Sequence, residues 1–354
     1  MKKSVKLAVV FLVALSFLCV LIHSDELPDT SPAPKEDEKI KLAIQSGLDW
    51  LAANQNNNGS WTCKIGCKLN ETYISNEEND NVAVTAIAGM SFLAQGSTPG
   101  RGKYGKNVEK ALNFVLSCVR TEDGYITKYG SRMYEHAFAT LFLAEIYGMS
   151  PKEELKLKLK KAAALIVQSQ NKEGGWRYQP SPVDADISVT VTTLQALRAA
   201  RNVGISVPKD VIENAMKYVH LAATPSGSFR YQLTGDSRTS PALTAAGVVA
   251  LMSAGEYDSK EVENGLRYLS LTIPVPFNNQ YPYHYFYGHY YIAQAMYQGG
   301  EKYWSRYRPI VHRDFLKAQK AEGNWADDVG ETYATAMATL ILQITSEYLP
   351  IFQR

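Results

Sequence analysis

One short motif occurs three times in the sequence, and this repetition constrains the fold more than any other feature. The copies read QNNNGSW at residues 55–61, QNKEGGW at 170–176 and QKAEGNW at 319–325. Weaker versions occupy residues 120–126 and 223–229. Glycines of successive copies stand about 50 to 65 residues apart, with one gap of about twice 50, which is typical of a chain built from repeated supersecondary units. The missing copy is expected near residue 275.

Each repeat unit holds two helical patterns of different character. Before the motif runs an amphipathic stretch, such as Ile40, Ile44, Leu48 and Leu51, whose spacing places one apolar stripe on a helix. After the motif comes a stretch rich in Ala, Thr and Leu and almost free of charge, such as VAVTAIAGMSFL. A helix that is apolar on most sides must be buried on most sides. The pattern therefore predicts an all-α fold, an α/α toroid of about six helical hairpins with inner and outer helix rings.

The motif residues are expected to be structural rather than catalytic. The Gly can end the outer helix in a left-handed conformation, the Gln can bond backbone groups left open at the last turn, and the Trp can fill the wedge between hairpins. These structural residues are Gln55, Gly59, Trp61, Gln170, Gly174, Trp176, Gln319, Gly323 and Trp325.

The three strong copies resemble the QW motifs of the squalene–hopene cyclase and protein prenyltransferase β-subunit superfamily. The resemblance covers residues 38 to 345. It implies an α/α-toroid domain, in agreement with the helical patterns. The full triterpene cyclases carry two such domains, and this chain has length for one.

The chain begins with the pattern of an exported protein. A basic start and 16 uncharged, mostly apolar residues predict a signal peptide over 1–24, followed by a flexible linker over 25–37 and the repeat domain over 38–350. We therefore expect a secreted protein, or one of the periplasm or cell envelope. Membrane association is expected only through an uncleaved leader or a lipid anchor at Cys19. In an oxidising compartment Cys63 and Cys67 could pair, and two free thiols are the alternative.

Charge and ligand patterns limit the partners. The net charge of +2 gives no indication of nucleic-acid binding. The stretch YFYGHYYIAQAM resembles the one that supplies a zinc-binding His in prenyltransferase β-subunits, which would be His289. The accompanying Asp and Cys ligands have no match in SRTSPALTAAG. Neither a metal nor a cofactor is therefore expected.

The segment DADISVT carries the sharpest catalytic hypothesis. It resembles the DxDD motif of class II terpene cyclases, with Asp184 at the first position, Asp186 as the acid and Ile187 in place of the last Asp. Such an acid needs a pKa raised by desolvation and by a neighbouring negative charge. In the alternative interpretation, Asp186 only caps the helix that follows it.

The inner helices also share equivalent polar positions. One column contains Thr85, His136, Thr190, Thr244, His289 and Thr335, and four residues earlier stand Asn81, Arg132, Asp186, Ser240, Tyr285 and Glu331. Asn81, Asp186 and Ser240 are good helix caps. The remaining polar residues predict a ligand-binding cavity mouth, with the two histidines facing each other across the ring. Its residues are Arg132, His136, Tyr285, His289 and Glu331.

Three functions fit these patterns, and whether the protein is an enzyme stays open. The leading hypothesis is an exported terpene-cyclase-like toroid that binds an apolar or polycyclic lipid in its cavity and cyclises or isomerises it with Asp186 as acid. The second is a non-catalytic binding or scaffold module of the cell envelope, for a peptide or a glycan. The third is a polysaccharide lyase that uses His136 or His289, Tyr285 and Arg132. A deep aromatic pocket favours the first, a filled ring the second, and an open polar groove the third.

Overall fold

The protein is described here from a computed structural model that covers residues 34–64, 78–128, 132–273 and 285–353. Residues Ala33–Arg354 form one compact unit. The leader, Cys67 and the motif copy expected near residue 275 lie outside the described residues, so the Cys63–Cys67 pairing does too. Among the described helices, none combines the length and apolar character needed to cross a bilayer.

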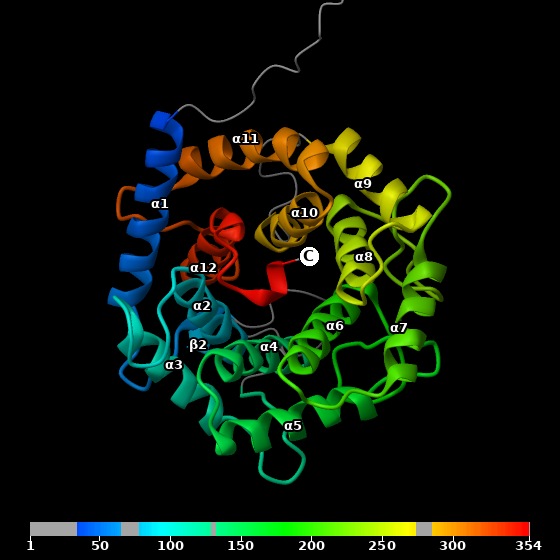
Figure 1. The fold of residues 1–354 in the computed structure, drawn as a ribbon, viewed down its shortest axis with the longest axis horizontal. Coiled ribbons are helices and arrows are strands. Elements are labelled where there is room, and N and C mark those ends of the chain that lie inside the picture. The colour runs from blue at the N-terminus through cyan, green and yellow to red at the C-terminus, as the bar shows by residue number, and fades with distance from the viewer. Residues whose placement is uncertain (1–33, 65–77, 129–131, 274–284, 354) are drawn as a thin grey trace, which may run out of the picture. The chain divides into compact units, whose positions relative to one another are not determined.

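Helices alternate between an outer and an inner ring, which confirms the predicted α/α toroid (Figure 1). The outer helices are α1 (Pro34–Ala53), α3 (Gly105–Ser117), α5 (Glu153–Gln168), α7 (Lys209–Ala222), α9 (Lys260–Thr272) and α11 (Glu301–Ala318). The inner helices are α2 (Val82–Ala94), α4 (Met133–Met149), α6 (Ile187–Asn202), α8 (Pro241–Ser253), α10 (Tyr285–Gln298) and α12 (Glu331–Leu342). The rings close where α12 packs on α2 and α11 on α1.

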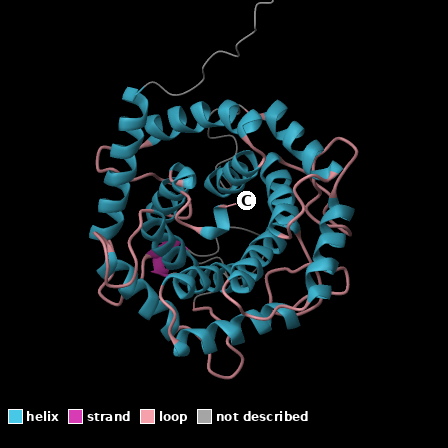
Figure 2. Ribbon diagram, in the orientation of Figure 1, coloured by secondary structure: helices cyan, strands magenta, loops and turns pink. Residues whose placement is uncertain are grey.

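Short elements complete the unit. Strands β1 (Thr62–Lys64) and β2 (Glu78–Asp80) pair antiparallel, with Thr62 opposite Asp80, beside the first hairpin (Figure 2). Two 3₁₀ turns, η2 (Ile344–Ser346) and η3 (Pro350–Phe352), follow the last helix. Helix α1 begins at Pro34, inside the segment that the sequence assigned to a linker.

Burial follows the two helical patterns. Every residue of α2 is buried, because its apolar side chains contact neighbours on all sides. The outer helix α3 buries one stripe that includes Val108, Leu112 and Val115 and leaves its charged residues in solvent. The distribution of apolar residues along each helix therefore indicates whether it lies in the outer or the inner ring.

The Gln of each strong motif copy joins one unit to the next. Its side-chain amide donates to the carbonyl of the motif Gly and to a carbonyl of the next outer helix. The second bonds run from Gln55 to Asn107 (3.0 Å), from Gln170 to Val211 (2.8 Å) and from Gln319 to Ala43 (2.9 Å). The last of these links α11 to α1, so the same bond also closes the ring.

The Trp of each copy joins the two helices of one hairpin. All three indoles are buried, and their Nε1 donates to a carbonyl near the end of the preceding outer helix: Trp61 to Leu51 (2.9 Å), Trp176 to Ile166 (2.7 Å) and Trp325 to Phe315 (2.9 Å). Their backbone N–H groups donate to Thr85, Thr190 and Thr335 of the inner helices.

The motif Gly has a different role from the one expected. The outer helices end several residues earlier, for example at Ala53, so the Gly does not terminate them. Gly59 and Gly174 do adopt positive φ, +91° and +97°. A Cβ at either position would lie 2.2 Å from a carbonyl oxygen of the next outer helix, so the Gly permits close approach of that helix. The Gln likewise bonds this neighbouring helix rather than the end of its own.

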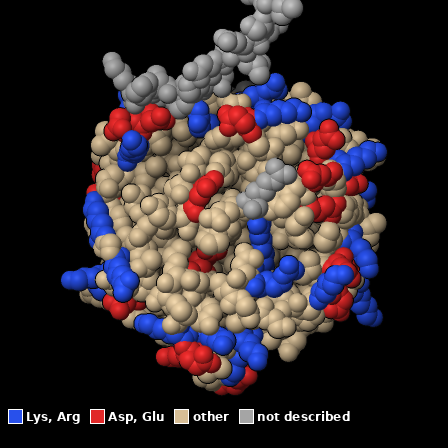
Figure 3. Space-filling view, in the orientation of Figure 1, with Lys and Arg blue, Asp and Glu red and all other residues tan. Residues whose placement is uncertain are grey.

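The chain end closes one side of the ring. Gln298, at the end of α10, donates to the carbonyls of Ile351 (3.4 Å) and Phe352 (3.2 Å), and Arg198 donates to that of Gln353 (2.9 Å). Ile351 and Phe352 are buried. Figure 1 places the C-terminus at the ring centre. In the same view, charged side chains gather mainly over the outer ring, with few near the centre (Figure 3). The end at which the inner helices finish is therefore covered.

The close approach at the motif Gly predicts a large cost for adding one methyl group there. Gly174→Ala combines a positive φ with a Cβ 2.2 Å from the Asn214 carbonyl oxygen, so we expect a loss of about 3 kcal/mol or more in the free energy of unfolding. Gly204→Ala is the matched control, because Gly204 has φ +83° but nothing within 4 Å of a Cβ. It is expected to cost about 1 kcal/mol. Equal losses in urea denaturation would contradict the close-approach role.

Candidate functional site

Three side chains from three inner helices meet where those helices begin. Tyr134 of α4 donates its hydroxyl to Ser188 Oγ of α6 (2.9 Å), and Tyr287 of α10 donates to the Ser188 carbonyl (3.0 Å). The two tyrosine rings lie edge to face with centroids 6.4 Å apart. Both tyrosines are partly exposed. We call Tyr134, Ser188 and Tyr287 the tyrosine mouth.

Below the mouth, side chains from separated helices fill the ring. Thr192 and Tyr291 share a hydrogen bond of 2.9 Å between α6 and α10, and one turn deeper Gln195 bonds Gln294. Phe138 of α4 packs against Tyr290 of α10, in the unit across the ring, with centroids 6.2 Å apart. All of these side chains are buried. Together with the C-terminal segment, they make the deep half of the ring a packed core.

Asp186 lies directly behind the mouth. It caps α6: its Oδ1 accepts the Val189 N–H (2.9 Å) and the Ser188 hydroxyl (2.6 Å). Its Oδ2 accepts the Tyr231 hydroxyl (3.3 Å) and lies 3.6 Å from Arg177 Nε. The residue is fully buried. The capping interpretation is therefore confirmed, and the same carboxyl also belongs to a larger polar network.

Burial controls the protonation of Asp186. Desolvation raises the pKa of its carboxyl to about 6, although the Ser188 hydroxyl, the Val189 N–H and Arg177 each act to lower it. From the sequence we expected a neighbouring negative charge as a second cause of the raised pKa, but the charged group beside Asp186 is the cation of Arg177. Asp184 is half exposed and forms an ion pair with Arg177, whose guanidinium lies between the two carboxylates.

A chain of hydroxyl groups links Asp186 through Ser188 to Tyr134, a residue that is partly exposed. Tyr134 donates to Ser188, and Ser188 donates to Asp186. Burial raises the pKa of Tyr134 well above its ordinary value, so its hydroxyl keeps its proton at neutral pH. When Asp186 binds a proton, reversal of the two hydrogen bonds can move one proton outward to Tyr134. The arrangement can therefore exchange a proton with a group that contacts the Tyr134 oxygen.

The two histidines do not face each other across the ring as predicted. His136 accepts the Ile126 N–H through Nδ1 (3.1 Å), and its Nε2 lies 3.0 Å from the Ala162 carbonyl of the outer helix α5. His289 Nδ1 lies 2.8 Å from the Tyr307 hydroxyl of α11. Burial lowers the pKa of both rings to about 4, so they are neutral at neutral pH. Both residues stand between the rings and hold them together.

The other predicted mouth residues also point elsewhere. Tyr285 packs on His289, with ring centroids 4.4 Å apart, and on Phe315 of the outer helix α11. Glu331 is half exposed and pairs with Lys320. Arg132, at the start of α4, contacts the Gln179 side-chain amide at 3.2 Å. Arg132, His136, Tyr285, His289 and Glu331 therefore do not converge on one site, whereas Asn81 and Ser240 cap their helices as expected.

The residues that do converge stand two positions before the predicted column. Two residues turn a helix by about 200°, so positions 134, 188 and 287 lie on nearly the opposite side from 136, 190 and 289. This shifted column reads Ala83, Tyr134, Ser188, Ala242, Tyr287 and Tyr333. The three tyrosines in this column were the sequence feature that could have revealed the mouth.

One cluster among the described residues has metal-binding side chains, His220, Glu256 and Glu261, outside the tyrosine mouth. His220 Nε2 lies 2.9 Å from Glu256 and Nδ1 lies 3.4 Å from Glu261. Because each carboxylate faces a different ring nitrogen, the imidazole bridges two acids and does not offer one nitrogen to an ion shared with both.

Comparison with known proteins identifies the fold of this chain but does not assign it to a family. No protein-family model matches the sequence, and no curated protein does. Among solved structures, a variant of the type II terpene cyclase MstE from Scytonema, in complex with its substrate geranylgeranyl dihydroxybenzoate, matches with a TM-score of 0.61 at 14% identity, over 90% of this chain and 99% of that one. The ligand-free MstE structure matches with a TM-score of 0.61 at 15% identity, over 88% of this chain and 100% of that one.

A second class of enzyme shares the same architecture. An inactive variant of an α-1,6-mannanase from Salegentibacter, in complex with α-1,6-mannotriose, matches with a TM-score of 0.60 at 10% identity, over 87% of this chain and 99% of that one. Identities this low show the α/α-toroid fold alone, and that fold hosts unrelated chemistries.

The buried carboxyl predicts a specific pH dependence of stability. The pKa of Asp186 rises from 3.8 to about 6 on folding, so the folded state holds this proton more tightly, and stability is lost as the pH rises through about 6. Asp186→Asn keeps a capping oxygen and removes the charge. Between about pH 4 and about pH 7, we expect its free energy of unfolding to rise relative to wild type by ~2 kcal/mol.

Urea titrations at both pH values measure this difference. Asp210→Asn, at an exposed position on α7, is the matched control and should follow the wild type. Parallel pH curves for wild type and Asp186→Asn would show that Asp186 does not titrate between these values.

Proposed function

We propose that the protein binds a glycan chain at the tyrosine mouth and that Asp186 exchanges a proton with an oxygen atom of the bound ligand. The supporting observation is the hydroxyl chain from buried Asp186 through Ser188 to partly exposed Tyr134. Hydroxyl groups and edge-to-face aromatic rings suit a ligand with many hydroxyls and apolar C–H faces.

The route of the proton favours an oxygen atom as its acceptor. Both oxygens of Asp186 are engaged by protein donors, and the carboxyl is fully buried. A proton therefore reaches a ligand by three linked transfers, from Asp186 to Ser188, from Ser188 to Tyr134 and from Tyr134 to the ligand, which leaves Asp186 as a carboxylate. A phenol with a raised pKa is a weak acid, suited to oxygen rather than to an alkene carbon.

The packing of the ring supports the same choice. Phe138, Tyr290 and Tyr291 occupy the deep half, and Phe352 lies against Tyr290 with ring centroids 6.2 Å apart. A long isoprenoid chain needs an extended apolar pocket, whereas one or two sugar residues can bind at the mouth itself.

Acid-catalysed cyclisation or isomerisation of an isoprenoid is the second candidate. The raised pKa of Asp186 favours it, because an alkene requires a protonated carboxylic acid. The solved type II cyclase MstE has the same fold and was captured with an isoprenoid substrate. In this candidate Asp186 must leave Ser188 and face the ligand directly, with Asp184 as its neighbour.

We further propose that the protein is exported through the segment 1–24 and acts outside the cytoplasm or in the cell envelope. Membrane attachment, where present, then depends on an uncleaved leader or a lipid anchor at Cys19. The intact mass of the protein recovered from the periplasm or the medium tests this: export predicts loss of the leader, and full-length protein in the cytoplasm contradicts it.

Removal of one hydroxyl tests the binding site. We expect Tyr134→Phe to weaken binding of a glycan that occupies the mouth by about tenfold, because it removes one hydrogen-bond partner without changing shape. Isothermal titration with α-1,6-mannotriose, hexagalacturonate and, in parallel, geranylgeranyl dihydroxybenzoate measures this effect. Tyr147→Phe, on the same helix at the closed end, is the matched control.

The pattern of binding separates the candidates. Glycan affinity that depends on Tyr134 but not on Tyr147 supports the proposed function. Binding of the isoprenoid alone, with turnover lost in Asp186→Asn, would replace it with the second candidate.

A further inference from the structure

Two adjoining pockets lie on the rim, outside the tyrosine mouth. Their volumes are about 530 and about 560 Å³, and they share Lys172, Glu173 and Thr234 as lining residues. The first extends over α7 to Leu221, and the second extends to Asp184. We call these two pockets together the rim groove.

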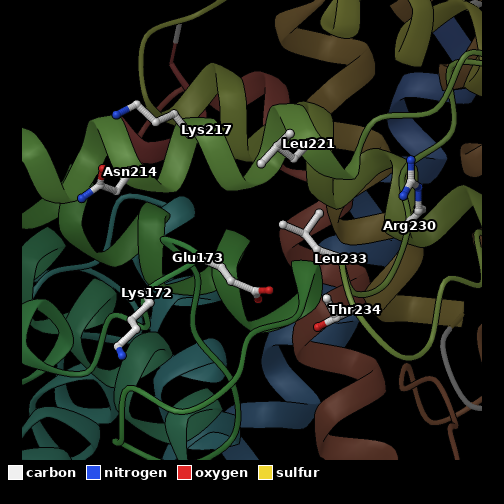
Figure 4. A pocket seen from close by; sticks show the side chains of 8 residues that line it. All are labelled: Lys172, Glu173, Asn214, Lys217, Leu221, Arg230, Leu233 and Thr234. Atoms are coloured by element: carbon white, nitrogen blue, oxygen red, sulfur yellow. The ribbon is translucent and has the colours of Figure 1, made fainter.

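The positive charge of the rim groove is not balanced by its neighbours. Lys172, Lys217 and Arg230 line the first pocket, and none forms an ion pair with another described residue. Figure 4 shows them around the edge of the pocket, with Glu173 directed toward its centre. Asp184, the other acid of the groove, already pairs with Arg177. Three cations therefore remain against one carboxylate.

Glu213, outside the groove, balances only part of this charge, because it interacts with both Lys209 and Lys217. Glu213 stands one turn before Lys217 on α7, and it pairs with Lys209 at 2.9 Å. The groove is consequently suited to a ligand with anionic groups at its edge and a hydrogen-bond donor near the Glu173 carboxylate.

Exposed apolar side chains add a second feature. Leu221 is 63% exposed in the first pocket and Val183 is 78% exposed in the second. Contact with the C–H faces of a ligand would remove the apolar surface of these side chains from water, which is favourable. A sugar ring that carries both hydroxyls and an acidic group offers an apolar face, a hydrogen-bond donor and a negative charge together.

The groove is connected to the tyrosine mouth through one side chain. Arg177 pairs with Asp184, which lines the groove, and also lies 3.6 Å from Asp186, which stands behind the mouth. One network of charged side chains therefore joins the groove to the carboxyl behind the mouth.

We propose that the rim groove binds the anionic groups of an acidic polysaccharide, uronate carboxylates or sulfate esters, whose chain continues into the tyrosine mouth. This inference rests on the proposed function, since it names the class of glycan bound at that site. The Glu173 carboxylate accepts a sugar hydroxyl, while Lys172, Lys217 and Arg230 neutralise the acidic groups.

Matched charged and neutral probes test the inference. Isothermal titration compares hexagalacturonate with its fully methyl-esterified form, and a heparin-derived hexasaccharide supplies the sulfated arm. We expect the wild type to bind an acidic probe at least about tenfold more tightly than the ester, with an affinity that falls as salt is added. Binding of hexagalacturonate shows that carboxylates suffice, whereas binding of the heparin hexasaccharide alone shows that sulfate groups are required.

Variants locate the charge recognition. The double variant Lys217→Gln/Arg230→Gln is expected to reduce the preference for the acidic probe about tenfold while leaving the affinity for the ester unchanged. The double variant Lys106→Gln/Lys160→Gln removes two exposed charges from α3 and α5, and it is expected to have no effect.

The outcomes separate this inference from the proposed function. Equal affinity for acidic and neutral probes, or a preference unchanged in the groove variant, overturns the inference even where Tyr134→Phe still weakens binding. If the groove variant loses the preference for the acidic probe while Tyr134→Phe has no effect, charge recognition by the groove is supported and glycan binding at the mouth is overturned. Binding of no glycan overturns both.

Discussion

The contact between each strong motif copy and the next outer helix is the interaction on which the toroid depends. The Gln side chain bonds a carbonyl of that helix, and the Gly lets its backbone approach without a side chain between them. Because Gln319 makes this bond to Ala43, the last unit meets the first by the same contact that joins the others. The Trp of each strong copy then fixes α2, α6 and α12 to their outer partners. Among the helices that form the mouth, α6 is held directly by the motif, through Trp176.

The sequence predicted the two rings because the outer helices carry one apolar stripe and the inner helices carry almost no charge. It did not predict which side of each inner helix faces the ring centre. A helix such as α2, buried all round, has no polar face that would fix its rotation. The prediction therefore chose the side that holds His136 and His289, which faces the outer ring, and missed Tyr134 and Tyr287. Contacts between side chains of different loop segments, such as the ion pair of Arg177 with Asp184, could not be predicted from local sequence patterns either.

The sequence offers two roles for Asp186, helix capping and proton exchange, and one carboxyl can perform both. Its Oδ1 accepts the Val189 N–H of the helix and the Ser188 hydroxyl of the mouth. Burial keeps its pKa near 6 without help from a second acid. The expected ligand changes as well. Tyr290 and Phe352 pack in the deep half of the ring, and the mouth residues that are not fully buried are two tyrosines, Tyr134 and Tyr287. These contacts favour a glycan over an apolar lipid as the ligand.

The most direct test of this account is a crystal structure of the protein with a bound hexasaccharide, chosen as the tightest binder among neutral and acidic probes. We expect a sugar oxygen within hydrogen-bond distance of the Tyr134 hydroxyl and a sugar ring against Tyr287, with Asp186 still bonded to Ser188. A sugar bound only on the outer surface, or a mouth closed by protein side chains in the complex, would contradict it.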